Sequence, residues 1–121
     1  MKKLQKTNKS NNLHLSLKEY INNSILNNEE IIIDLIVDNN SYFFTNKRII
    51  IFNEKYSSLN FNEIQSYFYN KISCVKYDNH IVNLDKYGLL EFNFSDSNKK
   101  LILNFPESII YNITNIIDKS H

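Results

Sequence analysis

The chain has 121 residues, 42% of them hydrophobic, which is enough to bury the core of one globular domain. Its 14 lysines and arginines balance 13 aspartates and glutamates, and the net charge of +1 excludes a global field that recruits nucleic acid or an anionic membrane. The single cysteine, Cys74, excludes an internal disulfide and suits a reducing compartment. Its neighbours Ile72 and Val75 predict that it is a buried core thiol.

Residues 1–12 are predicted to form a disordered tail. They are rich in lysine and asparagine and show no hydrophobic periodicity. The tail has no apolar segment of the kind found in signal peptides, and no apolar run of the sequence is long enough to span a bilayer. We therefore expect a cytoplasmic protein, with at most a weak attraction of the tail lysines to anionic lipid.

A short amphipathic helix is predicted over residues 13–28. Ser16 and Glu19 have the spacing of a capping box, which predicts that the helix begins there. The apolar residues that share one helical face are Leu17, Tyr20, Ile21 and Ile25. Such a helix needs a surface to pack on.

Three strands are predicted in the first half of the chain. Glu30–Val37 is an apolar run of strand length, and Asp38–Asn40 is a turn signal. The segments Tyr42–Thr45 and Arg48–Asn53 are rich in aromatic and β-branched residues and are separated by Asn46-Lys47. Because asparagine tolerates the positive φ of a two-residue turn, this pattern predicts a hairpin.

Four further strands are predicted in the second half. They are Ile64–Tyr69, Ile72–Asp78, Gly88–Ser95 and Lys99–Phe105. Glu54–Asn62 is expected to be a loop or a ragged strand extension. Asp78–Lys86, which contains His80, is expected to be a loop.

A C-terminal helix is predicted from Pro106 onward, since proline suits the first turn of a helix. Its continuous apolar stripe consists of Ile109, Ile110, Ile113, Ile116 and Ile117. Isoleucine is a weak helix former, so packing must hold this helix in place.

Two segments carry a resemblance to a known family. The Thr45-Asn-Lys-Arg48 turn between an aromatic and an isoleucine-rich strand, and the segment Phe68-Tyr-Asn-Lys-Ile-Ser-Cys-Val75, resemble bacterial pleckstrin-homology-like (PH-like, GRAM-like) domains. The resemblance implies a mainly β, α+β fold over residues 29–121: a seven-stranded antiparallel barrel or sandwich with a C-terminal amphipathic helix. The helix over 13–28 is then an extra N-terminal element.

No catalytic or metal site is predicted. The three histidines, His14, His80 and His121, lack the spacing of metal ligands, and one glycine in the whole chain cannot supply a phosphate-binding loop. Cys74 with the distant His80 as its base is one conceivable nucleophile, but a thiol inside an apolar strand is usually inert. We therefore expect no enzyme, no metal and no cofactor.

The candidate ligand-binding residues are Lys47 and Arg48, at the tip of the first predicted hairpin. In the PH family, basic residues around the first hairpins bind phosphoinositide headgroups, so the resemblance implies a possible contact with an anionic ligand. The structural alternative is that Lys47 is a solvated turn residue and that Arg48 pairs with Asp34 or with a backbone carbonyl.

The strand aromatics offer a second alternative, a stacking platform for single-stranded nucleic acid. They are Tyr42, Phe43, Phe44, Tyr67, Phe68 and Tyr69. Aromatics at alternating strand positions usually form core or cross-strand pairs, and the charge balance argues the same way, so nucleic acid is not the expected partner.

The leading hypothesis is a non-enzymatic PH-like module that binds another protein or itself through a sheet edge or a groove beside the C-terminal helix. One alternative is peripheral binding of anionic phospholipid by Lys47 and Arg48. Another is a small immunity or inhibitor protein that covers an active site.

Overall fold

A computed structural model describes residues 8–53 and 64–120, and within this range the chain forms two compact units. The first extends to Tyr67 and the second begins at Phe68. The loop expected over Glu54–Asn62 and residues 1–7 of the expected tail lie outside the described residues.

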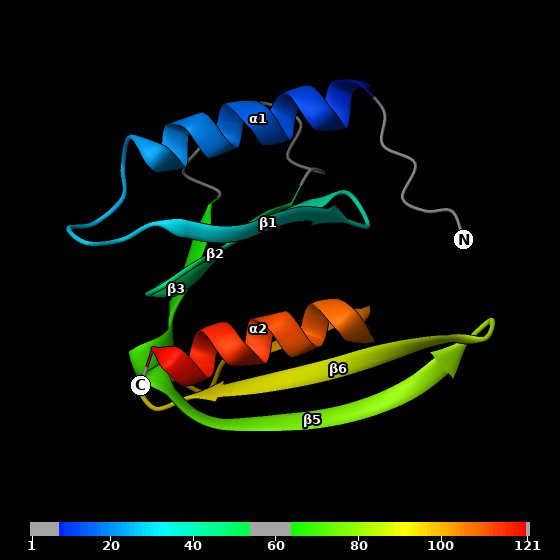
Figure 1. Ribbon diagram of the computed structural model, residues 1–121. Helices are drawn as coiled ribbons and strands as arrows, with labels where there is room; N and C mark the ends of the chain where they lie inside the picture. Colours follow the sequence, from blue (N-terminus) through cyan, green and yellow to red (C-terminus); the bar gives the residue numbers. More distant parts are fainter. Residues whose placement is uncertain (1–7, 54–63, 121) are drawn as a thin grey trace. The chain divides into compact units, whose positions relative to one another are not determined.

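The first unit is a four-stranded antiparallel sheet with one helix. Helix α1 (Asn8–Asn22) lies along one face of the sheet (Figure 1). The strands are hydrogen-bonded in the order β1 (Ile31–Val37), β2 (Asn40–Thr45), β3 (Arg48–Asn53) and β4 (Gln65–Phe68).

The second unit is a three-stranded sheet with the C-terminal helix α2 (Glu107–Lys119) against it. The short 3₁₀-helix η2 (Tyr69–Lys71) leads into its first strand. The sheet order is β5 (Ile72–Val82), β6 (Asp85–Phe94) and β7 (Lys100–Pro106), with both neighbouring pairs antiparallel. Figure 1 shows β5 and β6 as one long hairpin.

Two hairpin turns use left-handed backbone conformations without glycine. Asp38 (φ 52°) and Asn39 (φ 65°) connect β1 to β2, and Asn83 (φ 51°) and Leu84 (φ 73°) connect β5 to β6. Two consecutive positive φ angles match the right-handed twist of the flanking strands. Asparagine and aspartate accept this conformation at little cost, whereas a leucine there is strained.

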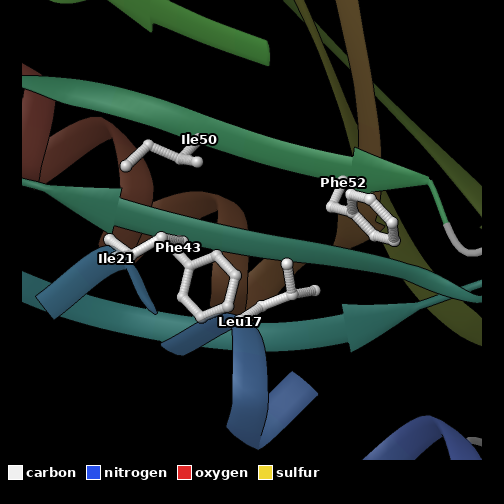
Figure 2. Close-up of a cluster of buried hydrophobic side chains, with 5 residues drawn as sticks. All are labelled: Leu17, Ile21, Phe43, Ile50 and Phe52. Carbon is white, nitrogen blue, oxygen red and sulfur yellow. The ribbon is translucent and has the colours of Figure 1, made fainter. Parts of the chain in front are cut away.

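The core of the first unit lies between α1 and the sheet. Its buried members, drawn in Figure 2, are Leu17, Ile21, Phe43, Ile50 and Phe52. Leu13 packs against this cluster one turn before Leu17, so the apolar face of the helix begins earlier than the residues after Ser16 suggest. The helix accordingly begins at Asn8 and ends at Asn22, and the prediction of a start at the Ser16 capping box was wrong.

In the second unit α2 covers β6 and β7. Its buried residues are Ile110, Ile113, Ile116 and Ile117, the stripe predicted from the sequence with the exception of Ile109, which is half-buried. A Cβ at Gly88 of β6 would lie 2.8 Å from Cγ1 of Ile110. The only glycine of the chain therefore stands where the helix approaches the sheet backbone.

All seven predicted strands and both helices are present, in two antiparallel sheets. In the described part of the chain, hydrogen bonds join the strands into two separate sheets, of four and three strands, and do not close them into a barrel.

Two local predictions on β5 were wrong. The expected loop Asp78–Lys86 is the end of β5, a two-residue turn and the start of β6. Cys74 is exposed rather than buried, because β5 is the last strand of its sheet. The predicted division into a tail (1–12), an N-terminal helix (13–28) and a PH-like domain (29–121) stays a prediction.

Candidate functional site

Arg48, one of the two residues predicted to bind a ligand, is held in an ion pair. Its Nε lies 2.8 Å from Oε2 of Glu29 and its second terminal nitrogen 3.1 Å from Oε1, a two-point contact with a fully buried carboxylate. The remaining terminal nitrogen lies 3.3 Å from Oγ of Ser66. The expected pairing of Arg48 with Asp34 was wrong, since Glu29 takes that place.

Glu29 contacts both residues that flank the Asn46-Lys47 turn, Thr45 and Arg48. Burial alone would raise the pKa of the Glu29 carboxyl, but hydrogen bonds from Arg48, the Leu26 amide and the Thr45 hydroxyl outweigh burial and hold the pKa below its ordinary value. The Thr45 hydroxyl also accepts the amide N–H groups of Lys47 and Arg48, each at 2.9 Å. These contacts give the turn a structural explanation, and the ligand-binding role of Lys47 and Arg48 stays a prediction.

A second polar cluster joins α1 to the sheet. Nδ1 of His14 lies 2.9 Å from Oγ of Ser41, and its Nε2 lies 3.0 Å from Oδ1 of Asp34. The imidazole stacks on Phe43 with 4.7 Å between ring centroids. Nζ of Lys18 lies 2.8 Å from the other oxygen of Asp34. This cluster could not be predicted from the sequence, because its members come from a helix and two strands.

The serine, histidine and aspartate have the order of a hydrolase triad, but the site is closed. Ser41 is 6% exposed and His14 is 7% exposed, so no substrate reaches the hydroxyl. Burial raises the pKa of Asp34, yet hydrogen bonds from Lys18 and His14 outweigh it and leave the pKa below its ordinary value. The cluster therefore anchors α1 to β1 and β2.

Other site chemistry is missing from the described residues. Over 8–53 and 64–120, no three histidine, cysteine, aspartate or glutamate side chains gather as metal ligands. His80 stacks on Tyr87 of the neighbouring strand, with 6.0 Å between ring centroids.

In the second unit, the outer edge of β5 has no neighbouring strand in its sheet. All of its residues except Ile72 and His80 are exposed. Val82 and Asp85 flank the two-residue turn and therefore form a hydrogen-bonded pair, so every second residue from Val82 backwards bonds to β6. The residues between them, Val75, Tyr77, Asn79 and Ile81, turn their N–H and C=O groups away from the sheet.

Among the residues that the structure describes, one local contact covers part of this edge. The amide N–H of Asn79 donates to Oδ1 of Asp78, its own neighbour, at 2.9 Å. Lys76 lies on the opposite face of the strand from Tyr77, with Nζ 3.9 Å from Glu91 of β6. The edge thus carries one acidic and one basic residue on the same face.

A groove runs along α2 beside the edge. A hollow of about 730 Å³ is lined by Tyr77 of β5 and by residues of the first two turns of α2, which are Glu107, Ser108, Ile110, Tyr111, Asn112 and Thr114. The Tyr77 hydroxyl donates to Oε2 of Glu107 at 3.0 Å, and this hydrogen bond raises the pKa of the tyrosine. Tyr111 is 68% exposed at the groove.

The sequence missed this edge for a definable reason. Residues 78–86 mix polar and apolar side chains without alternation, which indicates a loop, but an edge strand open on both faces has no buried face to impose alternation. The signal that could have found it was the β-branched pair Ile81-Val82 directly before Asn83, because such a pair followed by a turn residue is typical of a strand that ends in a hairpin.

Comparison with known proteins gives a consistent picture. The sequence model of a family described as Bacterial PH domain matches residues 7–120. A solved protein with a pleckstrin-homology domain from Shewanella loihica is similar in structure, with a TM-score of 0.65 at 18% identity over 86% of this chain and 89% of the other. A pleckstrin homology domain from Shewanella amazonensis has a TM-score of 0.58 at 16% identity over 84% and 96%. The search of curated proteins finds no match.

Proposed function

Because the chain belongs to the bacterial PH domain family, we propose that it is a non-enzymatic binding module whose β5 edge accepts an extended segment of protein. The segment comes either from another protein or from a second copy of the chain. The protein works in the cytoplasm in this proposal. Among the described residues no helix has the length and apolar character needed to cross a membrane.

The single observation that carries the proposal is the open outer edge of β5 beside the groove of α2. Backbone groups of Val75, Tyr77, Asn79 and Ile81 point outward, so an added strand completes their hydrogen bonds. Such an edge is usually shortened, bulged or covered in natural proteins. Here β5 is 11 residues long, its register shift lies at its start, between Ile72 and Cys74, and its side chains from Ser73 to Asn79 are exposed.

The groove offers the side-chain half of the recognition. A strand added to β5 alternates its side chains between the two faces of the sheet. Every second side chain would lie on the face of Tyr77, toward the hollow at Ile110 and Tyr111. The proposal therefore predicts a partner segment with apolar side chains at every second position.

The test is a proline scan of the two sheet edges. Asn79→Pro removes an N–H that points away from β6, so we expect the fold to persist and binding at the β5 edge to be lost. Asn104→Pro is the matched control, because Asn104 has the corresponding outward position on β7, the other edge strand. Thermal unfolding of both variants checks that the fold is kept.

Binding is measured with peptides selected from a displayed random library on the full chain. We expect selected peptides to alternate apolar and polar residues and to shift the backbone amide NMR signals of Val75, Tyr77 and Asn79. Binding retained in Asn79→Pro and lost in Asn104→Pro would contradict the proposal. Selected peptides that shift only signals of β2 and β3 would do the same.

The lipid alternative has less support, because Arg48 is already paired with Glu29 and buried to 15% side-chain exposure. It would have to rest on Lys47. Sedimentation of the chain with phosphatidylserine vesicles tests it through Lys47→Glu, which leaves the ion pair of Arg48 in place. The immunity or inhibitor alternative stays a hypothesis without a specific contact in its favour.

A further inference from the structure

Resting on the proposed function, we propose that the strand which β5 accepts is β5 of a second copy, antiparallel to the first, with Tyr77 opposite Tyr77 across a two-fold axis. Two such copies join their three-stranded sheets into one continuous six-stranded sheet. The partner is thus a second copy of this chain, and the register of the contact is fixed by the residues of β5.

The direction of the backbone groups limits the possible registers. After the register shift between Ile72 and Cys74, the residues of β5 that present outward N–H and C=O groups are Val75, Tyr77, Asn79 and Ile81. In an antiparallel pair the residues that exchange hydrogen bonds stand directly opposite each other. An outward residue of one copy must therefore face an outward residue of the other, which allows registers that move in steps of two residues along the partner.

Like-charge repulsion excludes the two registers on either side of the one that places Tyr77 opposite Tyr77. Placing Val75 opposite Tyr77 puts Lys76 opposite Lys76, and placing Tyr77 opposite Asn79 puts Asp78 opposite Asp78. Like charges directly opposite each other in a sheet are destabilising.

With Tyr77 opposite Tyr77, Lys76 of each copy faces Asp78 of the other copy. The two-fold axis therefore gives two equivalent ion pairs, one on each side of Tyr77. These pairs stand at positions that exchange no backbone hydrogen bonds, where facing side chains come closest.

The length of the strand selects the same register independently. β5 runs from Ile72 to Val82, and Tyr77 is its middle residue. Centred on Tyr77, the residues from Cys74 to His80 of each strand face one another, and the register shift between Ile72 and Cys74 falls at the end of the paired stretch. Registers centred on Val75 or Asn79 leave one end of both strands unpaired.

The contact that now covers the edge is compatible with this exchange. In the single chain, Oδ1 of Asp78 accepts the outward N–H of Asn79. In the pair, that N–H donates to the carbonyl of Val75 of the second copy, and the carboxylate is released to Lys76 of the second copy. One local hydrogen bond is replaced by a ladder bond and an ion pair.

Sedimentation equilibrium of the full chain over a range of concentrations tests the proposal through charge reversal. Lys76→Asp places two carboxylates opposite each other, and Asp78→Lys places two ammonium groups opposite each other. We expect each single variant to dissociate about tenfold more readily than the natural chain. The exchanged double variant Lys76→Asp/Asp78→Lys restores both pairs and should associate like the natural chain.

Mixing the two single variants gives the sharpest result. Lys76→Asp carries two acidic residues and Asp78→Lys two basic ones, so a mixed pair has opposite charges at both positions. We expect association in the mixture and little in either variant alone. Lys99→Asp is a control with an exposed lysine outside β5. Equal association of all variants would overturn the proposed register.

A cross-link reads the register directly. In a background of Cys74→Ser, Tyr77→Cys places two thiols opposite each other with Cα atoms about 5.5 Å apart, within reach of a disulfide. Asn79→Cys in the same background is the control, because Asn79 faces Val75 of the second copy. We expect a covalent dimer from the first variant only, under oxidation by glutathione.

Failure here is distinguishable from failure of the proposed function. A natural chain that stays monomeric up to about 1 mM overturns the pairing of two copies. If the library peptides still bind and Asn79→Pro still abolishes their binding, the β5 edge remains a site for another protein. If neither association nor peptide binding occurs, both proposals are wrong.

Discussion

The hairpins β2–β3 and β5–β6 differ in what surrounds their polar groups. In β2–β3 the turn is enclosed: Thr45 bonds the amides that follow it, the Asn46 side chain bonds the Glu30 amide and the Asn28 carbonyl, and Arg48 pairs with Glu29. In β5–β6 the turn exposes Leu84 to 94%, and one strand lies open along an edge.

The comparison teaches that charge in a hairpin does not by itself indicate a binding site. The first hairpin was predicted to be a ligand site because it carries Lys47 and Arg48; the contacts of Arg48 give its charge a structural role, and ligand binding there stays a prediction. The second carries more charged residues, which are Lys76, Asp78, Asp85, Lys86 and Glu91, and the backbone groups along the outer edge of its first strand are available. Four predictions sharpen this contrast, from the largest expected effect to the smallest.

Breaking the enclosed ion pair should cost the most. Arg48→Met leaves the buried carboxylate of Glu29 without its cation, so we expect the free energy of unfolding in urea to fall by about 3 kcal/mol. Lys71→Met is the control: its Nζ lies 3.8 Å from Asp96 and both side chains are more than half exposed, so we expect a loss of about 0.5 kcal/mol. Equal losses would show that Glu29 does not depend on Arg48.

Filling the space at Gly88 should disturb the second unit. The added Cβ of Gly88→Ala would meet Cγ1 of Ile110 at 2.8 Å and Cε1 of Tyr77 at 3.0 Å, so we expect a loss of about 2 kcal/mol in urea unfolding. A double-mutant cycle with Ile110→Ala should give a combined loss smaller than the sum of the two. If the losses of the two single variants simply add, the Cβ at position 88 does not meet the Ile110 side chain.

Acid should weaken the first unit in a graded way. Glu29 and Asp34 both have pKa values below their ordinary ones in the folded chain, so the unfolded chain binds protons more readily. Their contribution to stability is therefore present above the ordinary carboxyl pKa and is lost as the pH falls through the lowered, folded values. Urea unfolding at a series of acidic pH values measures this decline, and Asp34→Asn should make it shallower. An unchanged slope in that variant would exclude Asp34 as a cause.

The smallest effect is expected at the exposed turn. Leu84→Gly removes the strain of a leucine at φ 73°, partly offset by the greater freedom of glycine in the unfolded chain, so we expect a gain of about 0.5 kcal/mol. Asn39→Gly, at φ 65° in the β1–β2 turn, is the control and should change stability less, because asparagine tolerates this conformation. A larger gain at Asn39 would reverse the comparison.

The sequence predicted most of the elements because their signals are local. The strand Arg48–Asn53 has the predicted bounds, and the isoleucine stripe of α2 is buried almost as its spacing predicts. Asparagine takes the place of glycine in the β1–β2 turn, at Asn39, whereas neither Asn46 nor Lys47 has a positive φ, so the expected left-handed asparagine in the β2–β3 turn was wrong. The resemblance to bacterial PH-like domains, carried by two short segments, is confirmed by the family match and the fold.

Tertiary structure decided the partners and the exposure of the same residues. Glu29 rather than Asp34 pairs with Arg48, because sheet register brings residues far apart in sequence together. Cys74 is exposed and residues 78–82 form a strand, because β5 stands at the end of its sheet and needs no buried face. Periodicity and turn chemistry act between near neighbours and determine where strands and helices form; which edge stays open depends on the order in which distant strands pair.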